Sequence, residues 1–139
     1  MPAVDTKIRV RYKETDKMGV VHHSNYYTWF EIGRSEYMRA RGMTYRSMEE
    51  KGWMLPVIET RCFYKQPAKY DDTVIVRTRM ADFKGVRLKM EYEVIREEDG
   101  GLLAEGYTVH AITDANLKPV NIKKEDPELY RFFMECLER

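Results

Sequence analysis

"YKETDKMGVVHHSNYYTWFEIGRSE", residues 12–36, joins an acidic loop, two adjacent histidines and the start of a helix. Gly19 lies at the centre of the loop and predicts a turn, because glycine adopts backbone conformations that other residues avoid. Ser24 or Asn25 is expected to cap the following helix, and Gly42 is expected to end it. These signals predict a helix of about seventeen residues.

One face of this helix is expected to lie on a flat surface. Apolar or small side chains recur along it at helical spacing, namely Tyr26, Phe30, Gly33, Tyr37 and Ala40. Gly33 has no side chain, so the backbone there can approach its neighbour closely. The surface that the helix covers must come from the rest of the chain.

Segments of alternating polarity predict the strands of that surface. "KIRVRYK" places Ile8, Val10 and Tyr12 on one face. "GVRLKMEYEVIREEDGG" also alternates and turns into "LLAEGYTVHAITD", which predicts an antiparallel pair. "MLPVIETRCFYKQPAKYDD" and "TVIVRTRM" add two strands, with Pro56 and Pro67 at strand ends, at a bulge or on an edge.

The order of elements favours the α+β class. A tail helix is expected after Asp126 and Pro127, an N-cap and a first helical residue. One strand, a long helix, four strands and a tail helix predict a five-stranded antiparallel sheet packed on the long helix. We expect a single domain over residues 1–139, because chains of this length build one core.

Composition excludes several classes of function. Lysine and arginine number 24 and aspartate and glutamate 23, so the chain lacks the basic surplus typical of nucleic-acid or acidic-membrane binding. "MPAVDTKIRV" has no apolar core of a signal peptide, and no apolar run is long enough for a membrane span, which predicts a cytoplasmic protein. Cys62 and Cys136 match no metal-binding spacing, so no metal is expected.

Asp16 is the first candidate for chemistry. It lies between a predicted strand end and a helix start, where free backbone N–H groups and the positive end of the helix dipole favour negative charge. Such a carboxylate can attack a thioester carbonyl or activate water, while an amide near His23 polarises the carbonyl oxygen. The alternative is that Asp16 is an ordinary turn or cap residue.

"YKETDKMGVVHHSNYYTWFEIGRSEYM" resembles the signature of hotdog-fold acyl-CoA thioesterases of the 4-hydroxybenzoyl-CoA thioesterase type. The shared pattern is an aspartate, a glycine, a hydrophobic pair, an aromatic residue or histidine, and Asn-Tyr at the helix start. The resemblance extends over about residues 6 to 120 and is strongest to the bacterial Tol–Pal-associated branch. It implies a hotdog fold, in which an antiparallel sheet wraps around one long helix. The chain departs from the family at Asp71, where glycine is common.

The resemblance implies a role for three residues of the opening stretch. Asp16 becomes the catalytic carboxylate, and the backbone N–H of His23 becomes the oxyanion donor. The side chain of His23 assists in one bacterial branch, and the alternative is a packing role. We expect His22 and His23 to point apart, as adjacent residues often do. Tyr12 matches a strand-end tyrosine that supports the aspartate, unless it belongs to the core with Ile8 and Val10.

Coenzyme A binding is also implied by the resemblance. No glycine-rich phosphate loop occurs, so the phosphates would meet scattered cations, and the candidates are Lys84, Gly85 and Arg87 in "DFKGVRLK". The alternative for Lys84 and Arg87 is two solvated strand residues. No separate cofactor is expected, because coenzyme A is part of the substrate. The acyl group would lie near the helix, between walls that include Tyr26, Trp29, Met54 and Phe63.

Assembly and reaction complete these expectations. Unpaired sheet edges favour association, and similar enzymes pair two sheets edge to edge, which predicts a homodimer and then a homotetramer. The expected reaction is hydrolysis of an acyl-CoA or related pantetheine thioester. The alternatives are an acyl-CoA-binding protein without catalysis and a hotdog hydratase or dehydratase. The sequence leaves open the acyl group, the carrier and whether Asp16 is nucleophile or base.

Overall fold

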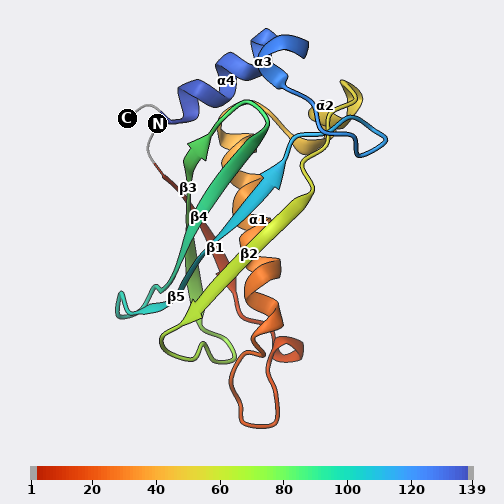
Figure 1. The fold of residues 1–139 in the computed structure, drawn as a ribbon. Helices are drawn as coiled ribbons and strands as arrows, with labels where there is room; N and C mark the ends of the chain where they lie inside the picture. The colour runs from red at the N-terminus through yellow and green to blue at the C-terminus, as the bar shows by residue number, and fades with distance from the viewer. Residues whose placement is uncertain (1–2, 138–139) are drawn as a thin grey trace.

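The computed structural model describes residues 3–137 (Figure 1). Its helices are α1 (Ser24–Ala40), α2 (Tyr45–Glu50), α3 (Ile122–Glu125) and α4 (Pro127–Leu137). Its strands are β1 (Val4–Arg9), β2 (Val57–Tyr64), β3 (Thr73–Phe83), β4 (Arg87–Arg96) and β5 (Leu102–Ala111). The strands form one sheet in the order β1-β3-β4-β5-β2, and all neighbours are antiparallel. This confirms the predicted α+β class and its five-stranded antiparallel sheet.

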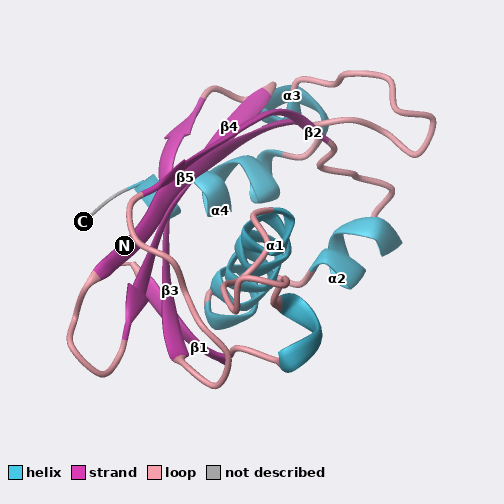
Figure 2. Cartoon of the chain, turned by 90° about the horizontal axis from the view of Figure 1, so that it is seen from below, coloured by secondary structure: helices cyan, strands magenta, loops and turns pink. Residues whose placement is uncertain are grey.

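The sheet curls around α1, which lies in its concave face (Figure 2). The predicted length of α1 is confirmed at 17 residues, and Gly42 follows its end with φ of 90°. The predicted cap is wrong, because Ser24 and Asn25 lie inside the first turn. The N-cap is His23, whose side chain makes no capping hydrogen bond, and the Ser24 N–H donates instead to Nδ1 of His22 at 3.3 Å.

The core lies between α1 and the sheet. Trp29, Phe30 and Tyr37 of α1 are fully buried, and Phe30 stacks on Tyr92 of β4 with ring centroids 4.3 Å apart. Ala40, which the helical spacing assigned to this stripe, is exposed because it lies in the last turn, beyond the covered surface. The rest of the predicted inward stripe is buried.

Gly33 is the position where α1 lies closest to the sheet. A Cβ atom built there would lie 2.6 Å from Oγ1 of Thr78 and 2.7 Å from Cγ1 of Val76, both on β3. Such distances are too short for carbon and oxygen atoms, so the predicted close approach at Gly33 is confirmed. The register of α1 on the sheet therefore depends on the absence of a side chain at this residue.

Gly33→Ala tests this packing. Helix propensity alone favours alanine by about 1 kcal/mol, whereas overpacking a close-packed core costs about 1–3 kcal/mol. We expect the steric term to dominate and the free energy of unfolding in urea to fall by about 1–2 kcal/mol. Thr28→Ala, on the exposed side of α1, is the control and should leave stability nearly unchanged. A Gly33→Ala protein as stable as wild type would contradict the close approach.

The first strand is shorter than its alternation predicts. β1 ends at Arg9, and a 3₁₀ turn over Tyr12–Glu14 then reverses the chain. Val10 stays buried, but the side chain of Tyr12 is 77% exposed, so the alternative that placed Tyr12 in the core is wrong. The physical reason is Glu14, whose buried carboxylate accepts a hydrogen bond from the Arg11 N–H and so closes the turn.

The remaining predictions for the strands and the tail helix largely agree with the structure. Pro56 and Pro67 lie outside the ends of β2, and β2 is an edge strand that pairs with β5. Asp126 caps α4, since its Oδ1 accepts a hydrogen bond from the Leu129 N–H at 3.1 Å. The short helix α3, capped by Asn121, was not predicted. It covers the β3–β4 turn together with α4 (Figure 1).

Candidate active site

Residues 15–21 form a tight loop before the N-terminus of α1 (Figure 1). Thr15 and Val21 face each other in an isolated antiparallel bridge, and the Asp16 N–H donates to the Val20 carbonyl at 2.9 Å. Gly19 has φ of 80° and its N–H donates to the Asp16 carbonyl, which confirms the predicted glycine turn. The loop thus holds Asp16 at a fixed place.

The carboxylate of Asp16 is half-buried, and only one of its two oxygens accepts a hydrogen bond within residues 3–137. Its Oδ1 accepts a hydrogen bond from the Met18 N–H at 2.8 Å, inside its own loop. Among residues 3–137, Oδ2 has no hydrogen-bond donor. Asp16 is therefore a turn residue, as the alternative from sequence proposed, and it also keeps one oxygen available for a reactant.

Glu14 fixes the loop relative to α1. Its carboxylate is 3% exposed and accepts hydrogen bonds from the Arg11 N–H at 2.7 Å, from Arg11 Nη2 at 3.3 Å and from Trp29 Nε1 at 3.1 Å. Its carbonyl accepts from the His22 N–H at 2.8 Å and from Asn25 Nδ2 at 3.0 Å. One residue thus joins the start of the loop over residues 15–21 to its end and to the first turns of α1.

The charge of Glu14 contributes to folding. Burial raises the pKa of this carboxyl, but the hydrogen bonds from Arg11 and Trp29 outweigh burial and leave the pKa below its ordinary value of 4.5. A carboxyl whose pKa is lowered by folding contributes stability above its unfolded pKa and loses it as pH falls. The sequence carries no signal for this role of Glu14, because its partner Trp29 lies fifteen residues away and neither residue type is typical of such a pair.

Glu14→Gln tests this role through its pH dependence. The amide removes the charge, so we expect the free energy of unfolding at pH 7 to fall by about 2 kcal/mol. As pH falls below 4.5 the carboxyl is protonated first in the unfolded chain, and at lower pH in the folded protein too, so the difference between the proteins should shrink as pH falls. Urea unfolding between pH 7 and pH 3 measures it. A difference that stays constant would contradict the charged hydrogen bonds.

His23 lies directly before α1 and offers its backbone N–H. Within residues 3–137 this N–H has no hydrogen-bond acceptor, which leaves it available at the positive end of the helix. The His23 ring is exposed and meets Tyr64 edge-on, with centroids 6.3 Å apart. The rings of His22 and His23 lie 4.3 Å apart, so the expectation that they point apart is wrong.

A cavity of about 290 Å³ lies beside His23. Its lining residues are Val21, His23, Tyr26, Tyr64, Lys65, Gln66 and Pro67. Asp16 does not line this cavity within the described chain. Asp16 and His23 therefore lie at opposite ends of one short loop, and His23 lines a cavity that Asp16 does not line within residues 3–137.

Tyr12 lies near the loop but contacts a different partner. Its ring meets Tyr70 edge-on at 5.6 Å, and its carbonyl accepts from the Thr15 N–H and hydroxyl. Tyr12 therefore supports the loop through its backbone, while its ring and hydroxyl face solvent.

Lys84, Gly85 and Arg87 lie at the other end of the molecule. They occupy the β3–β4 turn, close to α3, where the Gly85 carbonyl accepts from the Ile122 N–H at 2.9 Å. Gly85 has φ of 80°, so glycine is needed for the turn itself. The loop that carries Asp16 lies at the opposite end of α1, a helix about 25 Å long (Figure 1). One chain does not bring these three residues to Asp16.

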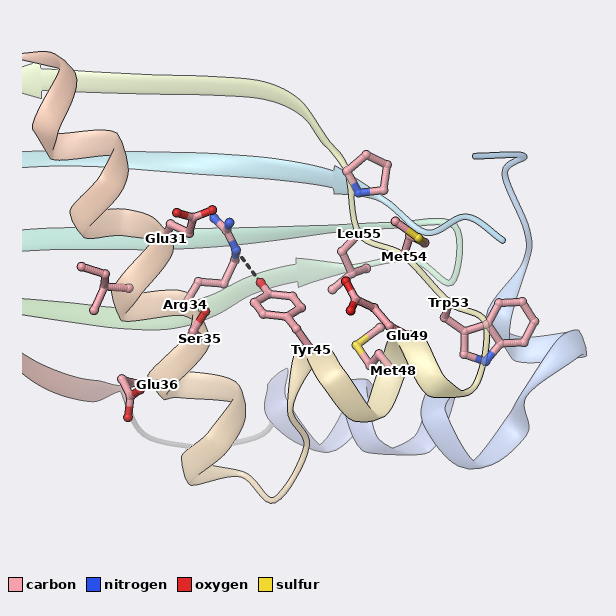
Figure 3. Close-up of a pocket in the computed structure, with 12 residues that line it drawn as sticks. Glu31, Arg34, Ser35, Glu36, Tyr45, Met48, Glu49, Trp53, Met54 and Leu55 are labelled. Carbon is pink, nitrogen blue, oxygen red and sulfur yellow. Dashed lines mark hydrogen bonds between the residues drawn. The ribbon is translucent and has the colours of Figure 1, made fainter. Parts of the chain in front are cut away.

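The largest of the described cavities, about 520 Å³, lies between α1, α2 and the segment that leads into β2 (Figure 3). Of the predicted acyl walls, Met54 lines it. Trp29 is fully buried in the core and Tyr26 lines the cavity beside His23. Phe63 lines a separate hollow with Arg77 and Arg79, on the face of the sheet that α1 does not cover.

Residues 10–133 match the Thioesterase-like superfamily. The chain belongs to this superfamily. It is 35% identical over 123 residues to a putative acyl-CoA thioesterase, YneP, of Bacillus subtilis, with 88% of each chain covered. It is 32% identical over 120 residues to the acyl-CoA thioesterase YbgC of Haemophilus influenzae, covering 85% of this chain and 87% of the relative.

Solved structures agree with this membership. The DHNA-CoA thioesterase of Staphylococcus aureus superposes with a TM-score of 0.91 at 33% identity, covering 97% of this chain and 91% of that one. The hotdog fold that the resemblance implied for this member of the superfamily is thereby confirmed. None of the helices described in residues 3–137 combines the length and apolarity needed to cross a membrane.

Proposed function

We propose that this protein hydrolyses acyl-CoA or related pantetheine thioesters to a free acid and a thiol. The observation that carries the proposal is the loop that joins a partly free carboxylate, Asp16, to a free backbone N–H, that of His23. Membership of the Thioesterase-like superfamily supports it, as do relatives named acyl-CoA thioesterases at 32–35% identity. Both parts that acyl transfer needs are present in one short segment.

Two routes use these groups. In the first, Asp16 takes a proton from water, the water oxygen bonds to the thioester carbon, and the carbonyl becomes an oxyanion that accepts a hydrogen bond from the His23 N–H. The carbon–sulfur bond then breaks, and the thiolate takes the proton from Asp16. In the second, Asp16 attacks the carbon, the thiolate leaves with a proton from solvent, and water hydrolyses the resulting anhydride.

The positive end of α1 serves both routes equally. Negative charge develops on the carbonyl oxygen in either transition state, and a backbone N–H that is already fixed needs no reorganisation to meet it. Loss of one such donor typically raises the barrier by roughly 2.7–4 kcal/mol. The exposed His23 ring lies beside the same position and is proposed to assist.

We propose that two chains complete the site. Val57, Ile58 and Tyr64 on the edge strand β2 are about half exposed, and antiparallel pairing of two β2 edges would cover them. Such pairing places opposite ends of the two sheets side by side. It would bring Lys84, Gly85 and Arg87 of one copy toward the catalytic loop of the other, which one chain alone does not do. The homodimer and its assembly into a homotetramer are part of this proposal.

The finer assignments are proposals of the same kind. They comprise the 4-hydroxybenzoyl-CoA type, the Tol–Pal-associated branch, the single domain over 1–139, the cytoplasmic location and the absence of a cofactor, since coenzyme A is part of the substrate. The opening motif supports the branch. Each of these stays a prediction.

Asp16→Asn tests the proposed function. Asparagine keeps an oxygen for the Met18 N–H, so the loop should keep its shape while the base or nucleophile is lost. We expect kcat to fall by roughly 10²–10⁴-fold in thiol release from a panel of aliphatic and aromatic acyl-CoAs. Asp5→Asn, an exposed aspartate paired with Arg77 on the sheet, is the matched control and should retain activity.

Equal turnover by Asp16→Asn and wild type would overturn the proposal. Hydration of an enoyl-CoA without thiol release would favour the hydratase alternative. Tight binding of acyl-CoA with no thiol release across the panel would favour a binding protein without catalysis.

A further inference from the structure

Arg34 is a buried cation whose partners are hydroxyl groups. It lies in the middle of α1 with 9% of its surface exposed. Its Nε donates to the hydroxyl oxygen of Tyr45 at 2.5 Å, and its Nη1 donates to that of Tyr92 at 3.2 Å. No carboxylate of residues 3–137 lies within ion-pair distance of Arg34. Burying a guanidinium costs desolvation free energy, and two phenol hydroxyls carry no opposite charge that would offset this cost.

One side of Arg34 belongs to a closed hydrogen-bond chain. Arginine only donates, so the Tyr92 oxygen accepts from Arg34 and its O–H donates to Thr108 Oγ1 at 2.7 Å. Thr108 then donates to His110 Nε2 at 2.8 Å. The other ring nitrogen of His110 donates to the carbonyl of Leu55 at 3.0 Å. The hydroxyl and ring hydrogens of Tyr92, Thr108 and His110 thus all have acceptors, so this branch holds Nη1 of Arg34 in place and these three residues have no vacant donor for a ligand.

The other side of Arg34 leaves one donor vacant. Tyr45 accepts from Arg34, and within residues 3–137 its own hydroxyl hydrogen has no acceptor at hydrogen-bond distance. A phenol that accepts from a guanidinium is a stronger donor in turn, since hydrogen bonds in a chain polarise one another. Tyr45 therefore presents a strengthened O–H in the cavity of about 520 Å³ that it lines with Arg34 (Figure 3).

The cavity around this O–H is apolar on one side and acidic at its rim. The apolar lining residues are Ile32, Met48, Trp53, Met54, Leu55 and Pro56. Three carboxylates also line the cavity, those of Glu31, Glu36 and Glu49, whereas Arg34 is the one cation among its lining residues. Three carboxylates would repel an anionic group, whereas a neutral oxygen would accept the Tyr45 hydrogen bond without that penalty. The lining thus suits an uncharged, largely apolar group that carries one oxygen.

The cavity continues toward the catalytic end of α1. Glu31 and Arg34 also line a neighbouring cavity of about 270 Å³ between α1 and β2, together with Tyr27 and Thr28. Tyr27 lies one helical turn from His23. The two cavities thus share Glu31 and Arg34, and together they lie along α1 between Tyr27 and Tyr45.

We propose that Tyr45, oriented by Arg34, is a specificity-determining residue that donates a hydrogen bond to a neutral oxygen on the distal part of the acyl group. This inference rests on the proposed thioester hydrolysis and names its substrate class, acyl groups with an uncharged oxygen substituent. Arg34 acts as a positioning residue. Met48, Met54 and Leu55 exclude water around the acyl group.

Tyr45→Phe removes the hydroxyl and keeps the ring. Matched substrates are 12-hydroxydodecanoyl-CoA against dodecanoyl-CoA, and 4-hydroxybenzoyl-CoA against benzoyl-CoA, with the CoA monothioester of dodecanedioic acid as the anionic probe. We expect wild type to prefer the hydroxylated member of at least one pair by roughly tenfold in kcat/KM, and Tyr45→Phe to lose that preference. The anionic probe should be the poorest of its series. Tyr107→Phe, whose hydroxyl contacts Glu59 on the sheet surface, is the matched control and should keep the preference.

Binding of the free acids, measured by calorimetry, separates this inference from the proposed function. If thiol release fails but wild type binds 12-hydroxydodecanoic or 4-hydroxybenzoic acid about tenfold tighter than the unsubstituted acid, the hydrolysis is wrong and the Tyr45 site stands. If Asp16-dependent hydrolysis occurs but neither pair is discriminated by wild type, the Tyr45 inference is wrong. A preference that survives in folded Tyr45→Phe would also overturn it. The absence of any preference in wild type would overturn the inference even if the variant does not fold.

Discussion

The candidate site depends on one buried carboxylate, that of Glu14. Three donors hold this group, two from Arg11 and one from Trp29, while the carbonyl of the same residue accepts from His22 and Asn25. The loop that carries Asp16 begins and ends at these contacts. Without them, a seven-residue loop whose one buried residue is Val21 would have few apolar contacts of its own to hold its shape. The hydrogen bonds of Glu14 thus fix the loop over residues 15–21 relative to the N-terminus of α1.

Helix α1 connects this loop to the rest of the molecule. Its N-terminus supplies the free amide of His23, its middle lies on β3 at Gly33, and its opposite side carries Arg34 toward Tyr45. The close approach at Gly33 fixes the position of α1 along its own axis. A shift of the helix along this axis would move His23 and Arg34 together. The proposed oxyanion donor and the proposed specificity residue are therefore both positioned by one helix. The N-terminus of α1 would bind the thioester carbonyl, and the middle of α1, through Arg34 and Tyr45, would bind the distal part of the acyl group.

Local signals in the sequence were enough to predict most of the fold. The extent of α1 followed from its apolar spacing and from Gly42, and β4 with β5 followed from strict alternation around a glycine turn. The alternation of Ile8, Val10 and Tyr12 was misleading, because it continues past Arg9, where Glu14 turns the chain. Pattern alone does not show where a hydrogen bond to a buried side chain interrupts a strand.

The site was predicted less completely than the fold. Asp16, His23 and the turn at Gly19 lie within one continuous stretch, so their neighbourhood was visible in the sequence. Glu14 and Arg34 were not, because their partners Trp29, Tyr45 and Tyr92 lie from 11 to 58 residues away and have no distinctive spacing. Lys84, Gly85 and Arg87 lie at the far end of α1, where the sequence could not place them relative to Asp16.

The most direct measurement is a crystal structure of the protein with a non-hydrolysable thioether or amide analogue of an acyl-CoA. The account predicts the carbonyl oxygen within hydrogen-bond distance of the His23 N–H, with the Asp16 carboxylate on the opposite side of the carbonyl carbon, in contact with it or with one water. A carbonyl bound away from the N-terminus of α1, with Asp16 still turned to its own loop, would contradict the account.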